Sequence, residues 1–477
     1  MASTIASPPR VGNTDFQIVL EPFLQSPGLA FTKVLSAEAI EQAFAERRAL
    51  FGRRDDEIFS TPIVLWAFLA QVLRDGKGAA CASAVADIAT HHQQTNRPIP
   101  CGDTGDYCRA RAKLNLGALQ MLTRRTAQRM EDEVNDAWRW RGRCAKLVDG
   151  FTFTMPDTPD NQRAFPQPAS QMPGAGLPIA RACAILSLST AAIHDLAVGP
   201  YQGKQTGETA LLRTMLDTFD PGDVAVFDRY YASYMMIALL QQRGVEVCAR
   251  RHQSRHGDFR RGRRLGDYDH LVSWTRPARP AWMSPREYEQ IPETMTLREL
   301  QFEITAPGCR TETITVVTTL LDPEAYPRET LAELYGYRWN AELDIRDIKQ
   351  TLGLDHVRCK TPAMVRREVQ VTLLAYNLIR GVIVTAATEH DKQPRQIGFT
   401  LTCQTVLSSW MLLTTRTARD AKELTRQALL RIAKNEVANR PGRIEPRVLK
   451  RRRHRYPLMQ KDRHTLRKEL ANGKGKL

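Results

Sequence analysis

One helix-forming segment combines a carboxylate with a tyrosine and several basic side chains. On an ideal α-helix, with about 100° between successive residues, these side chains fall within a sector of about 80°: Tyr335, Arg338, Glu342, Arg346 and Lys349. The sector borders the apolar face of the same helix, which places the stripe beside the buried side. An exposed helix laced with ion pairs would also explain the charges, but it gives no reason for a tyrosine in line with them.

Two aspartates follow short apolar runs that favour buried strands. Asp149 comes directly after the apolar pair at 147–148, and Asp228 comes directly after the run at 224–227. A carboxylate at the end of a buried strand lies at the edge of a sheet, where ligands bind in α/β folds. Either aspartate alone is more typical of a turn that ends a strand, so its role depends on a third acid.

Three acids that meet from two strands and a helix predict metal-dependent phosphoryl transfer. Asp149, Asp228 and Glu342 carry the oxygen ligands that Mg²⁺ prefers, and together they can hold two ions. One ion would activate water or a DNA 3′-hydroxyl group, and the other would stabilise the leaving oxygen. The basic side chains within two turns of the glutamate would lie where the scissile phosphate passes: Arg338, Arg346 and Lys349.

The spacing of the helical stripe resembles a motif of a known enzyme family. Tyr335, Arg338, Glu342 and Lys349 are separated by two, three and six residues. This spacing matches the Y-R-E-K pattern of bacterial transposases of the insertion-sequence-four family, and all four positions agree. The resemblance extends from about residue 146 to residue 360.

The two aspartate segments are also similar to motifs of that family. The sequence D-G-F-T, which begins at Asp149, looks like the first acidic motif, and D-R-Y-Y, which begins at Asp228, looks like the second. Tyr230 stands where many relatives carry glycine, so the turn after the second acid departs from the family pattern.

The resemblance implies an RNase H-like catalytic core in which Asp149, Asp228 and Glu342 form the metal-binding triad. It implies two Mg²⁺ ions, for which Mn²⁺ can substitute. We expect contacts with the DNA of the element ends from a set of side chains that surround the acids: Arg229, Tyr335, Arg338, Arg346 and Lys349.

Relatives carry a tryptophan in a β-rich insertion between the second aspartate and the glutamate, where it holds a base flipped out during hairpin formation. The segment 250–311 has the right place for this insertion and contains Trp274 and Trp282. We prefer Trp274 for the role. A tryptophan that packs the insertion onto the core is an equally good explanation for either residue.

The elements that must position these residues follow from the pattern of the chain. Short apolar runs alternate with helical segments and predict an α/β sheet: strands at 146–153, 180–189, 191–198, 223–227, 245–248 and 313–320, with helices at 208–217 and 232–242. One continuous helix is predicted from Glu329 to Leu352, ended by Gly353.

Three regions are therefore predicted. Residues 1–140 form a helical N-terminal domain for DNA binding or assembly. Residues 141–390 form the catalytic domain, an RNase H-like mixed sheet with flanking helices, interrupted by the β-rich insertion at 250–311. Residues 391–477 form a helical C-terminal region with a basic tail, and the fold class is α/β.

Composition restricts the partner and the compartment. The 68 Lys and Arg residues outnumber the 52 Asp and Glu residues, and the net charge of +16 favours nucleic acid over a membrane. The apolar run from Val369 is cut by Arg380, so no stretch approaches the roughly 20 residues of a spanning helix. The nine cysteines include no CxxC pair and indicate reduced thiols. Together with this composition, the family resemblance implies a bacterial cytoplasmic protein that is associated with the nucleoid.

The leading hypothesis is a DNA transposase that cuts at element ends and transfers strands into target DNA, with a hairpin intermediate. Its partners would be double-stranded DNA, both terminal inverted repeats and target, and a second copy of the chain in a synaptic complex. Two alternatives stay open: an RNase H-like nuclease without strand transfer, and a transposase-derived DNA-binding regulator. The intact set of three acids argues against the regulator.

Overall fold

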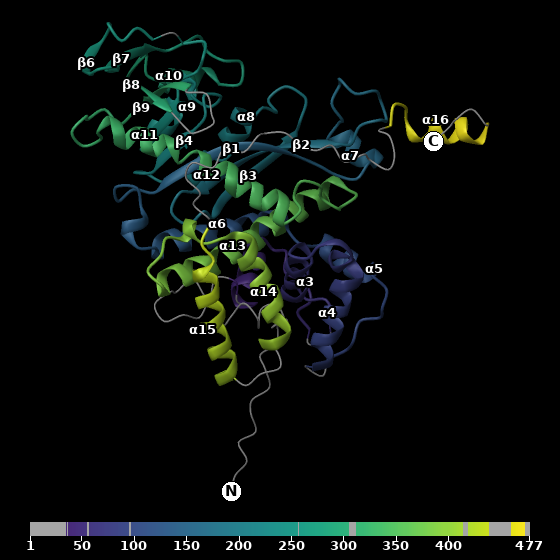
Figure 1. Cartoon of the computed structure of the whole chain (residues 1–477). Coiled ribbons are helices and arrows are strands. Elements are labelled where there is room, and N and C mark those ends of the chain that lie inside the picture. Colours follow the sequence, from purple (N-terminus) through teal and green to yellow (C-terminus); the bar gives the residue numbers. More distant parts are fainter. Residues whose placement is uncertain are drawn as a thin grey trace.

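A mixed sheet of nine strands runs through the middle of the molecule, with helices on both faces (Figure 1). The computed structural model describes residues 35, 37–54, 57–94, 97–255, 257–304, 312–413, 418–437 and 459–472. The strand order is β3-β2-β1-β4-β5-β9-β8-β7-β6. The strands are β1 (Ala145–Thr154), β2 (Ile179–Ser187), β3 (Ile193–Pro200), β4 (Val224–Phe227), β5 (Glu246–Arg250), β6 (Arg263–Gly266), β7 (Asp269–Thr275), β8 (Thr294–Ile304) and β9 (Glu312–Thr318).

The first five strands form the part of the sheet that carries the aspartates. β1 pairs antiparallel with β2, and β2 pairs antiparallel with β3. On its other side β1 pairs parallel with β4, and β4 pairs parallel with β5. An antiparallel meander followed by two parallel strands is the RNase H-like arrangement, and the predicted α/β fold class is confirmed.

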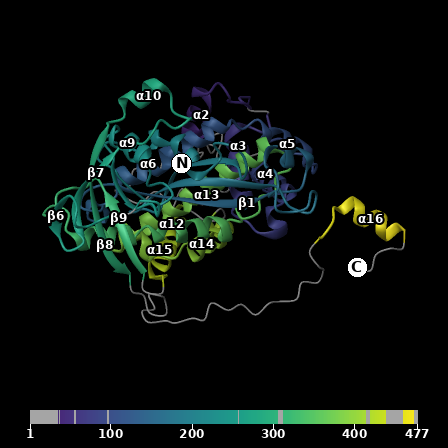
Figure 2. The same ribbon diagram turned by 90° about the horizontal axis from the view of Figure 1, so that it is seen from above.

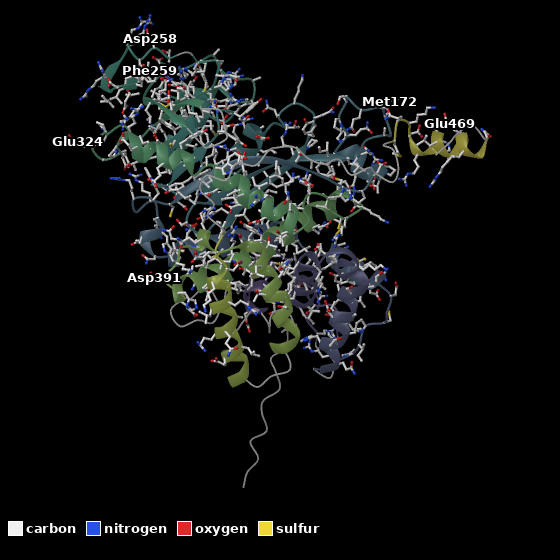
Figure 3. The ribbon with its side chains drawn as sticks, viewed as in Figure 1. Met172, Asp258, Phe259, Glu324, Asp391 and Glu469 are labelled. Atoms are coloured by element: carbon white, nitrogen blue, oxygen red, sulfur yellow. The ribbon has the colours of Figure 1, made fainter. Side chains whose placement is uncertain are left out.

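The insertion between β5 and β9 continues the same sheet. β9 pairs antiparallel with β5, and β8, β7 and β6 follow as antiparallel neighbours. A short helix, α10 (Pro285–Gln290), connects β7 to β8. Figure 3 labels Asp258 and Phe259 at the outer end of this insertion. The strands of the insertion are therefore hydrogen-bonded to the core through β9.

Helices cover the two faces of the sheet, and an apolar cluster lies between the sheet and the helices on each face. One cluster lies on the face of α13 and the N-terminal helices, and the other lies on the face of α8 and α9. The helices before the sheet are α2 (Ala37–Glu46), α3 (Thr61–Val72), η2 (Gly76–Ala79), α4 (Cys81–Gln94), α5 (Gly105–Ala112), α6 (Leu116–Glu133) and η3 (Asp136–Trp138). Those within the sheet region are α7 (Pro159–Ala164), α8 (Glu208–Arg213), η4 (Leu216–Thr218) and α9 (Tyr234–Gln241).

The helices after the sheet complete the fold. They are α11 (Arg328–Gly336), α12 (Trp339–Arg346), η5 (Asp347–Thr351), α13 (Pro362–Glu389), η6 (Pro394–Gln396), α14 (Phe399–Leu413), α15 (Ala418–Lys434) and α16 (Arg463–Ala471). α16 lies away from the body in two views (Figures 1 and 2). Most of the basic tail, including the run at 450–455, lies outside the described residues.

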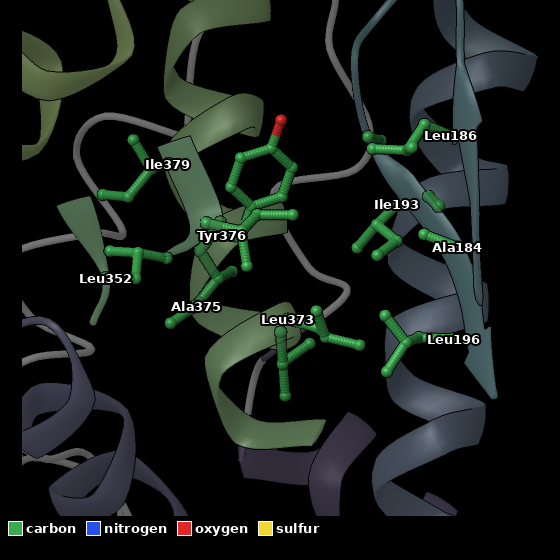
Figure 4. Packing of buried hydrophobic residues seen from close by; sticks show 14 of the residues in the cluster. Ala184, Leu186, Ile193, Leu196, Leu352, Leu373, Ala375, Tyr376 and Ile379 are labelled. Carbon is green, nitrogen blue, oxygen red and sulfur yellow. The ribbon is translucent and has the colours of Figure 1, made fainter. Parts of the chain in front are cut away.

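α13 is the central helix of the core. Figure 4 shows Leu373 and Tyr376 of this helix facing Ile193 and Leu196 of β3. In length and composition α13 could cross a membrane, so the sequence-based statement that no stretch is long enough was wrong. In the protein, 94% of its most apolar window is buried, which identifies it as a core helix. Arg380 does not interrupt it, because the guanidinium group is paired inside the protein.

The helix that carries the acidic residue is not continuous as predicted. α11 ends at Gly336 and α12 begins at Trp339. Across the junction the backbone N–H of Arg338 donates to Tyr335, and that of Ala341 donates to Arg338, both at 3.0 Å. These i to i−3 bonds tighten the turn, and the following segment η5 widens into a π-helix. The residues keep helical conformations, but the regular 100° spacing is lost at both places.

Candidate active site beside the central strands

The two aspartates occupy neighbouring positions in the sheet. In the parallel pair of β1 and β4, Val148 lies opposite Phe227; Asp149 is the next residue of β1, and Asp228 directly follows the last residue of β4. β1 continues to Thr154, so Asp149 lies within its strand and not at the end as predicted, because the strand remains paired with β2 beyond it. Neighbouring strands are about 4.8 Å apart, so the two acidic residues begin from adjacent positions. Side chains alternate along a strand, and Leu147 belongs to the cluster under α13. Asp149 therefore faces the side of the sheet on which α12 lies.

Arg338 joins the first aspartate to the glutamate. Its Nη1 atom lies 3.7 Å from Oδ2 of Asp149, and its Nη2 atom lies 2.9 Å from Oε1 of Glu342. The arginine is largely buried, with 16% of its side chain exposed. The i,i+4 spacing of Arg338 and Glu342 survives the irregularities on either side, and the structure brings both side chains beside Asp149 in β1.

Asp228 lies at the same edge but turns toward a different neighbour. Its Oδ1 atom accepts a hydrogen bond of 2.7 Å from the backbone N–H of Arg229. Burial raises the pKa of the Tyr335 hydroxyl, and the charge of Asp228 raises this pKa further, so these two side chains lie near each other. Tyr335 is buried, with its ring 6.4 Å from that of Phe302.

The acids have the right chemistry for a hard divalent cation, but they do not form a complete ligand set. Among the described residues, no group of three or more Asp, Glu, His or Cys side chains is close enough to hold a metal ion. Carboxylate oxygens are the ligands that Mg²⁺ prefers. The donor chemistry of Asp149, Asp228 and Glu342 therefore fits the ion, and a shared ion requires their side chains to turn toward one another.

The pKa of Asp149 is raised by its surroundings. Burial, together with the charges of Glu342 and Glu208, raises it from the ordinary 3.8 to about 6. The backbone N–H of Gly150, at 2.8 Å, and the guanidinium group of Arg338 act in the opposite direction. One arginine does not offset the burial and the neighbouring acids, so a bound cation would stabilise the ionised carboxylate.

A cavity of about 270 Å³ opens beside these acids and is bordered by basic side chains. Lys349 in η5 forms an ion pair of 2.9 Å with Asp355, and Arg346 is exposed. The lining includes both acids that contact Arg338 and the two basic residues: Asp149, Gly150, Phe151, Glu342, Ile345, Arg346, Lys349, Gln350 and Asp355. Asp228 is not among the residues that line it.

Arg229 lies on the other side of the acids, toward the insertion. Its Nη1 atom donates to the side chain of Gln253 at 3.2 Å. The predicted DNA-binding residues therefore divide into two groups. Arg346 and Lys349 border the cavity, whereas Arg229 and Tyr335 lie near Asp228.

Trp274 lies inside the insertion rather than on its surface. Only 6% of the residue is exposed, and its indole N–H donates to Oε1 of Glu299 at 3.0 Å. The guanidinium carbon of Arg255 lies 3.8 Å from the ring centroid. Trp282 is half-buried, with Arg213 at 3.9 Å over its ring. Packing accounts for these contacts, and the role of Trp274 toward a flipped base stays a prediction.

Two acidic residues near the site were missed by sequence reasoning. Asp355 pairs with Lys349, and Glu208 lies against Gly150. Glu208 and Gly150 are far apart in the sequence, and an irregular turn separates Lys349 from Asp355. Neither residue has a neighbouring motif, so a tertiary contact was the only available signal.

Comparison with known proteins extends this picture. Residues 140–378 match the family described as the transposase DDE domain. The transposase InsG of insertion sequence element IS4 from Escherichia coli (strain K12) is 27% identical over 368 residues, which cover 76% of this chain and 79% of that protein. The transposase of insertion sequence element IS421 from Escherichia coli is 32% identical over 83 residues, 17% of this chain and 22% of that protein.

Among solved structures, the cryo-EM structure of the piggyBac transposase synaptic complex with hairpin DNA is similar over 88% of this chain and 82% of that chain. The TM-score is 0.40 and the sequence identity is 8%.

The family match includes all three predicted acids and half of the chain. Together with the similarity to the IS4 transposase, it confirms the resemblance to insertion-sequence-four transposases. Members of this family cleave and join DNA and generally use divalent metal ions. The chain therefore belongs to the DDE transposase family and is a DNA transposase that acts on DNA as an enzyme.

Proposed function

We propose that this transposase moves its element by a cut-and-paste reaction in which Asp149, Asp228 and Glu342 are the catalytic acids. It nicks DNA at the terminal inverted repeats, forms a hairpin at the element end, and joins the released element to target DNA. The observation that carries the proposal is the contact of Arg338 with both Asp149 and Glu342, one strand away from Asp228.

The proposed cofactor is a pair of Mg²⁺ ions held by the three acids, with Mn²⁺ as a substitute. When bound, such ions activate the attacking oxygen and stabilise the leaving oxygen. The chain itself supplies the carboxylate ligands and a basic surround for phosphate groups. Arg346 and Lys349 border the cavity beside Asp149, which supports their role in binding the DNA backbone.

The proposed assembly is a homodimer that holds two element ends in one synaptic complex. The net charge of +16 supports an extended contact with DNA. We further propose that the protein is cytoplasmic and associated with the nucleoid through its DNA substrate. The N-terminal helices at 37–133 would bind the terminal repeats or contribute to assembly.

A reaction with defined DNA tests the proposal. Purified protein and Mg²⁺ are incubated with labelled DNA that carries the sequences flanking the gene, together with a supercoiled target plasmid. We expect cleaved DNA with a hairpin at its end, either on the element or on the flanking DNA. We also expect element ends that are joined to the plasmid. Glu342→Gln protein is the control, and it should give neither.

The same experiment separates the alternatives. A nuclease without strand transfer would release cut ends but no joined products. A DNA-binding regulator would retard the labelled DNA in a gel without cutting it. Complete absence of metal-dependent cleavage by the wild-type protein would contradict the proposed function.

A further inference from the structure

A fourth carboxylate lies against the segment that carries the first aspartate. Glu208 is the first residue of α8, and its side chain occupies the space beside Gly150. A Cβ atom at position 150 would lie 2.6 Å from Cγ of Glu208 and closer still to Cδ and Oε2. The φ angle of Gly150 is outside the left-handed region. A side chain at position 150 would therefore have to displace the carboxyl end of Glu208.

The same carboxylate also holds the segment after the second aspartate. The hydroxyl of Tyr231 donates to Oε2 of Glu208 at 3.0 Å, and Tyr231 is only 1% exposed. The backbone N–H of Tyr231 donates to the carbonyl of Asp228 at 3.1 Å. One tyrosine thus connects the turn at Asp228 to Glu208 through two hydrogen bonds.

Glu208 acts from the face of the sheet opposite to the cavity. Val148 and Tyr231 belong to the apolar cluster under α8 and α9, and Gly150 shares the face of Val148 because side chains alternate along β1. Asp149 faces the other way, toward α12. The carboxylate of Glu208 therefore contacts the neighbours of the two aspartates, Gly150 and Tyr231.

The position of Glu208 is fixed by the helix that carries it. Leu211 and Leu212 of α8 are buried, 8% and 0% exposed, in the cluster that also contains Tyr231. On β2, Cys183 lies opposite Gly150, and its sulfur lies 3.7 Å from the Tyr231 hydroxyl. The glutamate is thus held by the packing of its helix and by a partly buried hydrogen bond with Tyr231.

We propose that Glu208 is a positioning residue that sets the relative placement of Asp149 and Asp228 by holding Gly150 and Tyr231. This inference rests on the proposed role of the two aspartates. Misplacement of reacting groups by about 1 Å costs up to about 100-fold in rate, and loss of a residue that orients metal ligands typically costs about 10- to 100-fold in metal affinity. A contact that fixes both segments is therefore important for catalysis without touching DNA.

The test compares Glu208→Ala with Glu208→Gln. Alanine removes the acceptor and the filled space, so we expect the cleavage rate at saturating DNA and Mg²⁺ to fall about 10- to 100-fold. Calorimetry with Mn²⁺ alone should show binding weakened about 10-fold. Glutamine keeps the size and an acceptor for Tyr231, and it should restore both quantities to within about threefold of wild type. Failure of glutamine to restore them would overturn the positioning role.

Two further variants keep the test decisive if Glu208→Ala does not fold. Tyr231→Phe removes the donor from the same contact and should weaken cleavage and Mn²⁺ binding in the same direction. Tyr234→Phe is its matched control, because Tyr234 is equally buried and donates to Pro292 at 2.7 Å without contacting Glu208. Equal behaviour of the two phenylalanine variants would overturn the proposal.

The contact between Gly150 and Glu208 can be tested by an independent experiment. Gly150→Ala alone should reduce cleavage, because its new Cβ atom overlaps Glu208. In the Glu208→Ala background the same change should have no further effect, since the space is then free. Additive losses would contradict the contact.

Failure of this inference is distinguishable from failure of the proposed function. Wild-type cleavage by Glu208→Ala and Tyr231→Phe, with none by Asp149→Asn, would overturn only the role of Glu208. Wild-type cleavage by Asp149→Asn would overturn the proposed function on which it rests.

Discussion

Asp344 accepts a hydrogen bond of 3.1 Å from Arg380 in the interior of the protein, two residues beyond Glu342. Arg395 binds the same carboxylate at 2.9 Å. The side chain of Asp344 is 3% exposed and that of Arg380 is 4% exposed. The pair therefore fixes the rotation of α12 about its own axis relative to α13. That rotation determines the direction in which Glu342 points.

We expect Asp344→Ala to lower the free energy of unfolding by about 3 kcal/mol, because it leaves the buried Arg380 with only its longer pairing to Asp347, at 3.5 Å. Urea unfolding followed by circular dichroism measures the change. The control is Glu423→Ala, whose ion pair with Arg426 is exposed on α15 and should contribute little to stability. Similar losses in both variants would show that the buried pair does not fix the helix.

We expect Asp149→Asn to stabilise the protein while it abolishes cleavage. The pKa of Asp149 is raised to about 6 in the folded protein, so its contribution to stability is complete below pH 3.8 and is lost as the pH rises through about 6. Above that pH the ionised carboxylate in its buried place destabilises the folded protein, and asparagine, which carries no charge, removes this destabilisation. Without added metal, the gain should reach about 3 kcal/mol at pH 7.5 and about half of that at pH 5.

Thermal unfolding at the two pH values measures this gain. Asp160→Asn, a change at a surface acid with 57% of its side chain exposed, is the control. A gain of the same size at both pH values would contradict the assigned pKa.

The central strands and the positions of the acids could be predicted because local sequence determines them. Each aspartate directly follows an apolar run, within β1 at Asp149 and after β4 at Asp228, and the pairing of Arg338 with Glu342 requires only one turn of helix. These segments could therefore be recognised from their own residue patterns, without knowledge of the segments that pack against them.

β8 could not be recognised for a physical reason. Its central residues, Arg298 and Glu299, are 1% and 3% exposed, which is unusual for charged side chains. Asp269 pairs with Arg298, and Arg251 pairs with Glu299, each at 2.5 Å. Because these partners come from other segments, the sequence of the strand alone resembles a polar loop.

The DNA-binding role of the cavity rim predicts a change in salt dependence. Lys349→Ala should weaken DNA binding and reduce the slope of log K against log salt by about one, because one phosphate contact is lost. Asp355→Asn should act in the opposite direction, since it releases Lys349 from its ion pair. Fluorescence anisotropy over a salt series measures both, with Arg426→Ala as an exposed control. A slope for Lys349→Ala equal to that of wild type would exclude a phosphate contact.

Asp228→Asn and Glu342→Gln should abolish cleavage and leave the affinity for element-end DNA within about threefold of wild type. Each change keeps the size of the side chain but removes a ligand charge that a divalent ion requires. Gel retardation measures binding, and cleavage of labelled DNA measures activity in the same samples. Cleavage at the wild-type rate by either variant would remove that residue from the triad.

Trp274→Ala should have two separable effects. Loss of a buried indole should destabilise the protein by about 3–5 kcal/mol, and this effect lowers the amount of active protein in every step equally. If the ring also holds a flipped base, hairpin formation should slow more than first-strand nicking. The ratio of the two single-turnover rates isolates the second effect, because it does not depend on the active fraction. An unchanged ratio, with Trp282→Ala measured beside it, would leave Trp274 with a packing role alone.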